Sequence, residues 1–143
     1  MTGVQTCALP IWDYDLGFEN DYRTYPINDL PDFIYCTNGS AASDAIKEMV
    51  SKIVKEDPEA KARLIEIWET ALSEGNLKDL VSYMEESAEL LQESQELNFK
   101  RWKILNQYTH MNFQALGSYE AEVSTVRDYI NGRLTRFDQL IRR

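Results

Sequence analysis

Several features that would assign a protein quickly to a functional class are scarce or missing here. The 143 residues include two cysteines and one histidine, too few for a disulfide framework or a cysteine-histidine zinc site. No apolar run approaches the roughly 20 residues of a membrane-spanning helix, so no transmembrane segment is expected. Only 15 Lys and Arg stand against 24 Asp and Glu, which gives a net charge of −9. Because such a surface repels phosphate backbones, we expect no nucleic-acid partner.

The composition that remains is typical of a folded domain. Hydrophobic residues make up 43% of the chain and charged residues 27%, with three tryptophans and eight tyrosines. These proportions favour a globular protein over a disordered tail. The length fits one domain or a part of a larger one.

The first eleven residues differ from the rest in origin. Residues 1–11, MTGVQTCALPI, resemble the conceptual translation of a common sequencing adapter read from a GTG start. We interpret them as an adapter-derived artefact. On this interpretation Trp12 is expected to be an interior residue of a longer protein.

The remaining chain divides into a loop-rich segment and a helical segment. Residues 12–39 are acidic and contain Pro26 and Pro31, which exclude a long helix. An Asn38-Gly39 turn closes this segment. The apolar pattern of residues 40–143 then predicts about four helices.

The first two of these helices have clear local signals. One is predicted from Ser40, and the next begins at Asp57 and Pro58, an N-cap followed by a proline at the first helical position. Gly75 is predicted to end the second helix. The first apolar stripe is Ile46, Met49, Val50, Ile53 and Val54, and the second is Leu64, Ile65, Trp68 and Leu72.

A long third helix is predicted from about Asn76. Two seven-residue series predict a seam that faces partner helices. Gln95 and Asn98 place polar groups in this seam beside Trp102, so this point either specifies register or borders a wet cleft. The series are Leu77, Met84, Leu91, Asn98 and Leu105, and Val81, Ala88, Gln95 and Trp102. The acidic run is interpreted as the solvated face of this helix: Glu85, Glu86, Glu89, Glu93 and Glu96.

The last helix follows a loop predicted over residues 106–117. Ser118 is the expected N-cap, and Glu120 and Glu122 fall in the positive first turn. Arg142 suits the negative C-terminal end. The apolar stripe is Val123, Val126, Ile130, Phe137 and Ile141, flanked by Leu134 and Leu140.

The strongest signal for a chemical site is the stretch WDYDLGF at residues 12–18. Its carboxylates, Asp13 and Asp15, lie two residues apart just before a glycine turn and can aim at one cation. Mg²⁺ takes oxygen ligands, and few of them from protein when a nucleotide supplies phosphates. The alternative is a solvated acidic turn whose Asp side chains bond nearby backbone amides.

This stretch resembles the WD[FYW]DLxFG motif of the CotH family, the spore coat protein H kinases. Further stretches resemble family motifs in the same order, so the resemblance covers residues 12–143. It departs from the family pattern at Glu19, where the family has glycine. The further stretches are Asp57-Pro58-Glu59 with Arg63 and Trp68, then Asn98-Phe99-Lys100-Arg101-Trp102, then Ser118 to Val123 with Tyr129, Ile130 and Arg133.

The resemblance implies a mainly α structure, the helical C-terminal lobe of an atypical protein-kinase-like fold. Residues 40–143 would form this lobe, after a WDxD metal loop in residues 12–39. The implied activity is Mg-ATP-dependent phosphoryl transfer to serine or threonine of a protein, with Asp13 and Asp15 binding the Mg²⁺ and ATP. The family's nucleotide lysine and catalytic acid lie upstream of the motif, so we expect no catalytic residue in this fragment and no activity from it alone. The implied parent protein is secreted, on the cell surface or in the spore coat, and its substrate is a coat or extracellular protein.

The alternative function is a non-catalytic helical module that scaffolds a coat or cell-surface assembly. Glu19 in place of the family glycine favours this module. The enzyme hypothesis instead predicts Asp13 and Asp15 together on a loop at one end of the helices, beside an exposed apolar patch.

Five other side chains are candidates for chemistry. His110 is interpreted as a loop residue and Cys36 as an unreactive thiol, since neither has a suitable partner nearby in sequence. Trp68 and Trp102 are expected in the core. Arg101 and Trp102 could instead shape a substrate groove.

Overall fold

A computed structural model of the chain describes residues 41–75, 77–109 and 112–143. These residues form five α-helices, so the mainly α class expected from the sequence is confirmed, with one helix more than anticipated. The helices are α1 (Ala41–Glu56), α2 (Pro58–Ser73), α3 (Leu80–Leu90), α4 (Gln92–Arg101) and α5 (Tyr119–Arg142).

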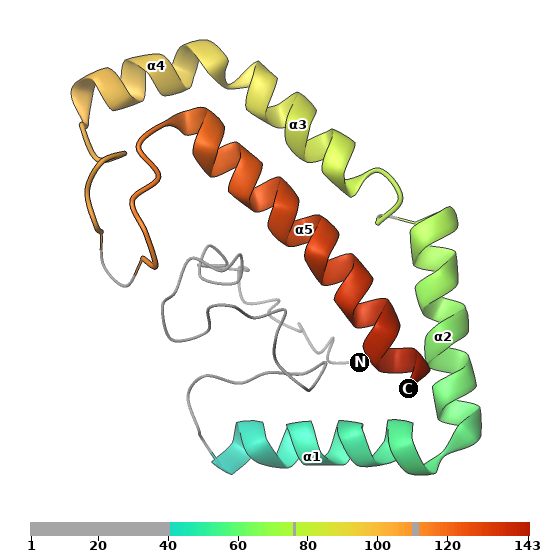
Figure 1. Cartoon of the computed structure of the whole chain (residues 1–143). Coiled ribbons are helices and arrows are strands. Elements are labelled where there is room, and N and C mark those ends of the chain that lie inside the picture. Colours follow the sequence, from blue (N-terminus) through green and yellow to red (C-terminus); the bar gives the residue numbers. More distant parts are fainter. Residues whose placement is uncertain (1–40, 76, 110–111) are drawn as a thin grey trace, which may run out of the picture.

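Helix α5 is the central element of the described fold. In Figure 1, α1, α2, α3 and α4 follow one another along an outer curve, and α5 runs diagonally inside it. Helix α5 packs against α2 and α3, and α1 packs against α2. The buried apolar side chains among the described residues come from α2 and α5: Trp68, Ile130, Leu140 and Ile141.

Helix α2 begins where the sequence predicts. The Asp57 carboxylate accepts hydrogen bonds from the backbone N–H groups of Glu59 and Ala60, at 2.9 and 3.1 Å. Pro58 follows as the first helical residue, where its missing N–H costs nothing. The predicted N-cap is therefore confirmed.

The predicted long third helix is wrong, because the chain forms two shorter helices there. Helix α3 ends at Leu90 and α4 begins at Gln92, with Leu91 between them at φ −85° and ψ 0°. No residue of α4 is buried, and Trp102 at its end is 55% exposed. The predicted seam therefore does not continue as a buried contact along α4.

The composition of α4 explains this difference. Its ten residues, QESQELNFKR, include only two large apolar side chains, Leu97 and Phe99. A helix without a continuous apolar stripe gains little by packing along its whole length. Of the two polar positions predicted in the seam, Gln95 is half-buried and Asn98 is exposed.

The stripe predicted on α1 is only partly covered. Val50 and Val54 are half-buried, whereas Met49 is 56% exposed and Ile53 is 46% exposed. This pattern fits a helix that lies at one end of the described fold and packs against α2.

The loop between α4 and α5 positions the start of α5. Gly117 has φ +85°, a backbone conformation that favours glycine, and its N–H donates to the carbonyl of Leu105 at 2.9 Å. The next residue, Ser118, accepts a hydrogen bond from the Ala121 N–H at 3.1 Å through its hydroxyl. The predicted N-cap of the last helix is confirmed.

Candidate functional site

The residues predicted to bind metal and nucleotide, Asp13 and Asp15, lie outside the described residues. Cys36 and His110 do as well, so the predicted apolar patch beside the acidic pair stays a prediction. In residues 41–75, 77–109 and 112–143, no group of three or more His, Cys, Asp or Glu side chains could hold a metal ion. None of the helices described is both long and apolar enough to cross a membrane.

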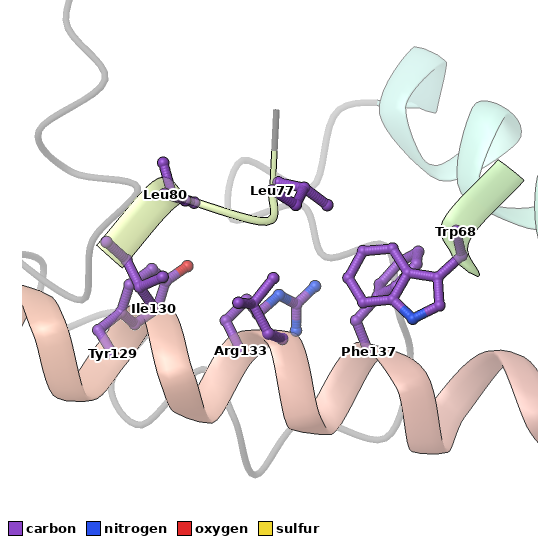
Figure 2. Close-up of a pocket in the computed structure, with 8 residues that line it drawn as sticks. Trp68, Leu77, Leu80, Tyr129, Ile130, Arg133 and Phe137 are labelled. Carbon is purple, nitrogen blue, oxygen red and sulfur yellow. The ribbon is translucent and has the colours of Figure 1, made fainter. Parts of the chain in front are cut away.

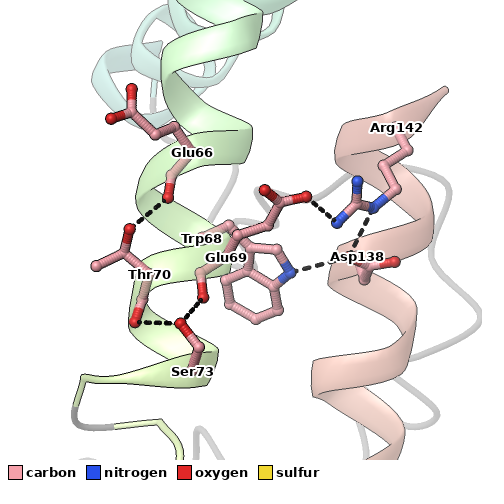
Figure 3. Close-up of polar contacts among 7 residues, drawn as sticks. All are labelled: Glu66, Trp68, Glu69, Thr70, Ser73, Asp138 and Arg142. Atoms are coloured by element: carbon pink, nitrogen blue, oxygen red, sulfur yellow. Dashed lines mark hydrogen bonds and ion pairs between the residues drawn. The ribbon is translucent and has the colours of Figure 1, made fainter.

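The most extensive polar cluster in the described part joins α2 to the end of α5. Figure 3 shows Arg142 between two carboxylates, Glu69 on α2 and Asp138 on α5. Its Nε donates to Asp138 Oδ1 at 2.8 Å, and its Nη2 donates to Glu69 Oε1 at 3.1 Å. The indole Nε1 of Trp68 donates to the same Asp138 oxygen at 3.1 Å.

This cluster shifts the pKa values of its members in the directions that strengthen it. The hydrogen bond from Arg142 is the main cause that lowers the pKa of Asp138, and the Trp68 hydrogen bond adds to it. Hydrogen bonds to Asp138 and then Glu69 raise the pKa of Arg142. The lowered pKa of Asp138 and the raised pKa of Arg142 both favour the charged forms of these side chains. The cluster therefore links α2 to α5.

The Trp68 ring packs directly beside this cluster. Its centroid lies 4.7 Å from that of Phe137, with the two ring planes at 54°. The side chain is only 9% exposed, so the prediction of a core residue is confirmed.

An apolar groove opens next to Trp68. Its volume is about 340 Å³, and in Figure 2 the side chains from α2, the α2–α3 turn and α3 face those of α5 across it. Among the described residues that line this groove, only Arg133 has a permanently charged side chain. The described lining is Trp68, Leu77, Leu80, Tyr129, Ile130, Arg133, Leu134 and Phe137.

A second groove of about 520 Å³ continues between α3 and α5 and shares Leu80 and Ile130 with the first. Its described lining is apolar except for Ser87, Glu122 and the hydroxyl of Tyr83 and Tyr119. Burial raises the pKa of Glu122, and a hydrogen bond with the Leu116 backbone partly opposes that shift. Among the described residues that line the two grooves, no serine, threonine or cysteine nucleophile forms a hydrogen bond to a base.

The motif stretches at residues 98–102 and 118–123 meet at the junction of α3, α4 and α5. The Phe99 and Tyr119 ring centroids lie 6.4 Å apart. The Tyr119 hydroxyl donates to the carbonyl of Ala88 at 3.1 Å. These contacts hold the start of α5 against the outer helices.

Trp102 does not join this junction as a core residue. At 55% exposed it corrects the prediction of burial, because α4 ends at Arg101 and the backbone turns extended at Trp102. Its ring instead lies under the guanidinium of Arg101, 5.1 Å from the centroid. Neither residue lines the two grooves along α5.

Sequence analysis missed Asp138 and the role of Arg142 in the cluster. The Asp138–Arg142 pair could have been predicted, because the two residues are four apart on a predicted helix and this spacing brings side chains together. The link to Trp68 spans 70 residues and leaves no such local signal.

The fold and these contacts describe a helical domain whose motif residues fasten α5 to its neighbours. The family profile described as CotH kinase protein matches residues 4–136, most of the chain. The chain belongs to the CotH kinase family, and the resemblance stated from its motifs is confirmed. The match begins within residues 1–11, so it does not separate the adapter-like residues from the rest. No curated protein and no solved structure matches the chain.

Membership of this family has general functional consequences. A kinase family implies use of a nucleotide and a metal, and it suggests a protein substrate. The family name also suggests a spore-coat setting.

Proposed function

We propose that this chain is the C-terminal part of a CotH-like protein kinase that transfers a phosphoryl group from Mg-ATP to serine or threonine of a coat or extracellular protein. The observation that carries the proposal is the family match over residues 4–136, together with the WDxD stretch at its beginning. The parent protein would be secreted, on the cell surface or in the spore coat.

The donor chemistry of Asp13 and Asp15 fits the cofactor. Both offer carboxylate oxygens, the ligand type that Mg²⁺ prefers, and a pair of carboxylates leaves further coordination positions for nucleotide phosphates. When bound, Mg²⁺ supplies charge neutralisation at the phosphates. Asp13 and Asp15 would hold the ion, one as direct ligand and the other bracing the loop.

The helical part would act as the support of this site. Helix α5 is fastened to α2 through Trp68, Asp138 and Arg142, and to α3 through Tyr119. A rigid helical base keeps the groups attached to it in a fixed geometry, which phosphoryl transfer requires. The nucleotide lysine and the catalytic acid would come from sequence before Trp12, so residues 12–143 alone would be inactive.

Titration with Mg-ATP tests the proposal. The upstream sequence is first recovered by resequencing the DNA before the Trp12 codon, and the extended protein is titrated by calorimetry. Asp13→Ala and Asp15→Ala are expected to abolish the heat of binding. Asp79→Ala is the matched control, because Asp79 is an exposed aspartate whose side chain makes no capping hydrogen bond.

Two other outcomes count against different parts of the proposal. No heat with the extended protein would favour the non-catalytic scaffold module, which the Glu19 departure also supports. Heat that survives both Asp13→Ala and Asp15→Ala would show that the acidic pair does not hold the metal and nucleotide.

A further inference from the structure

Helices α3 and α4 carry a row of exposed apolar side chains. Tyr83 is 71% exposed, Leu90 is 84% exposed and Leu97 is 71% exposed. They lie seven residues apart, so on a continuous helix they return to nearly the same face, within about 20° per step. The row extends over about 21 Å at 1.5 Å per residue.

The break between α3 and α4 preserves this alignment. The Leu91 N–H donates to the Ser87 carbonyl at 3.1 Å, and the Gln95 N–H donates to the Leu91 carbonyl at 2.8 Å. Both are bonds of helical spacing, so the chain keeps turning through Leu91. Figure 1 accordingly shows α3 and α4 as one bent arc.

The side of α3 that faces α5 lies next to this row. Met84 and Ala88 line the groove between the two helices, and the Ala88 carbonyl accepts the Tyr119 hydroxyl. Tyr83 lines the edge of that groove, whereas Leu90 and Leu97 line neither groove along α5. The packing of the described fold therefore leaves Leu90 and Leu97 exposed and Tyr83 largely exposed at the rim of the groove.

Four carboxylates lie along one edge of this row: Glu86, Glu89, Glu93 and Glu96. All four side chains are exposed, and none forms an ion pair with a residue that the structure describes. Their neighbour Glu85, by contrast, faces Arg127 of α5 at 3.7 Å. The row and these four carboxylates together are called the α3–α4 face below.

We propose that the α3–α4 face is a docking surface for a basic amphipathic helix of a protein partner. Single exposed apolar residues are common on protein surfaces, but three at heptad spacing match the way one helix recognises another. The carboxylate edge selects the partner's charge, because it attracts lysine and arginine and repels a second copy of the same face. The proposal goes beyond phosphoryl transfer and does not depend on it.

A synthetic peptide is the probe. It carries leucines at heptad spacing with lysines on both sides of them, and its binding to the full chain is measured by fluorescence anisotropy. Leu90→Ser and Leu97→Ser are each expected to weaken binding about tenfold, the loss that corresponds to leaving one leucine contact unmade. Ile67→Ser is the matched control, because Ile67 is also 52% exposed but lies on α2.

A charge exchange tests the carboxylate edge separately. The double variant Glu86→Lys with Glu93→Lys should lose the lysine peptide and gain a peptide with glutamates in place of those lysines. The matched control reverses two exposed acids elsewhere, Glu48→Lys with Glu74→Lys, and should keep the original preference. Circular dichroism of each variant confirms that the helices remain.

Three outcomes would overturn the proposal. The lysine peptide fails to bind, or it binds the Leu90→Ser and Ile67→Ser proteins equally well. In the third outcome, sedimentation velocity finds a dimer of the chain that Leu90→Ser dissociates, which would assign the face to a second copy.

Discussion

Replacing Trp68 by alanine removes the main aromatic contact between α2 and α5. The Trp68 ring is 9% exposed, its centroid lies 4.7 Å from that of Phe137, and its N–H donates to Asp138. Truncating a buried tryptophan costs about 3–5 kcal/mol, since both the transfer free energy and the packing around the new cavity are lost. Because domains are stable by only about 5–15 kcal/mol, Trp68→Ala should lose a large share of its unfolding free energy.

Trp102 provides a control of the same residue type in the same chain. It is 55% exposed, and its one described ring contact is the Arg101 guanidinium at 5.1 Å. An exposed cation–π contact contributes about 0.5–1 kcal/mol. Trp102→Ala should therefore lower the unfolding free energy by no more than about 1 kcal/mol.

Urea unfolding followed by far-UV circular dichroism measures both variants without relying on tryptophan fluorescence. Trp68→Phe extends the test if Trp68→Ala does not fold, because it keeps a ring beside Phe137 and removes only the indole N–H and part of the volume. Its unfolding free energy should fall between those of the wild type and Trp68→Ala. Equal losses for Trp68→Ala and Trp102→Ala would refute the division of the two tryptophans into core and surface.

Three further predictions concern α5 and its start. Ile141 is completely buried, so Ile141→Ala should lower the urea-unfolding free energy by about 2–5 kcal/mol, whereas Ile67→Ala at a 52% exposed position should change it much less. Gly117→Ala should lower the unfolding free energy by about 1–2 kcal/mol and the thermal midpoint with it, because φ is +85° and the added Cβ would lie 3.0 Å from Asn106 Oδ1. An unchanged midpoint would contradict this account. Burial raises the pKa of Glu122, so the folded state holds this proton more tightly than the unfolded state. The unfolding free energy should therefore fall as pH rises from the ordinary glutamate pKa through the raised one, and urea unfolding at a series of pH values should find that fall reduced in Glu122→Gln.

The parts of the fold that the sequence predicts well depend on contacts between near neighbours. Asp57 caps α2 through amides two and three residues away, and Ser118 caps α5 through an amide three residues away. A helix start is specified by such short-range hydrogen bonds, so a single sequence carries the information. Long apolar stripes add to it in α5, where Ile130 and Ile141 are both buried.

The prediction of a buried seam along the third helix was wrong in part because the spacing of apolar residues does not tell which face of a helix is covered. The series through Val81, Ala88, Gln95 and Trp102 has the same spacing as the exposed row of Tyr83, Leu90 and Leu97. Only the position of α5 decides between the two faces, and that position depends on contacts far away in sequence. One of them is the hydrogen bond from Trp68 to Asp138, which no local sequence pattern predicts.

Several motif residues that resemble the family within the described part make contacts between helices. Trp68 packs on Phe137, Phe99 lies beside Tyr119, and Tyr119 bonds the Ala88 carbonyl. Part of the family pattern in this region therefore corresponds to contacts that hold the helices together. The chemistry of the proposed function rests on other residues, Asp13 and Asp15.

Stability and nucleotide binding should consequently respond to different substitutions. Trp68→Phe is expected to lower the unfolding free energy of the upstream-extended protein while keeping the heat of Mg-ATP binding, because the indole N–H donates to Asp138 of the neighbouring helix α5. Asp13→Ala is expected to abolish that heat and leave the urea midpoint of the helices in place. If Trp68→Phe instead removed nucleotide binding from a fully folded protein, the helical part would contribute directly to the site, and its assignment as a support would be wrong.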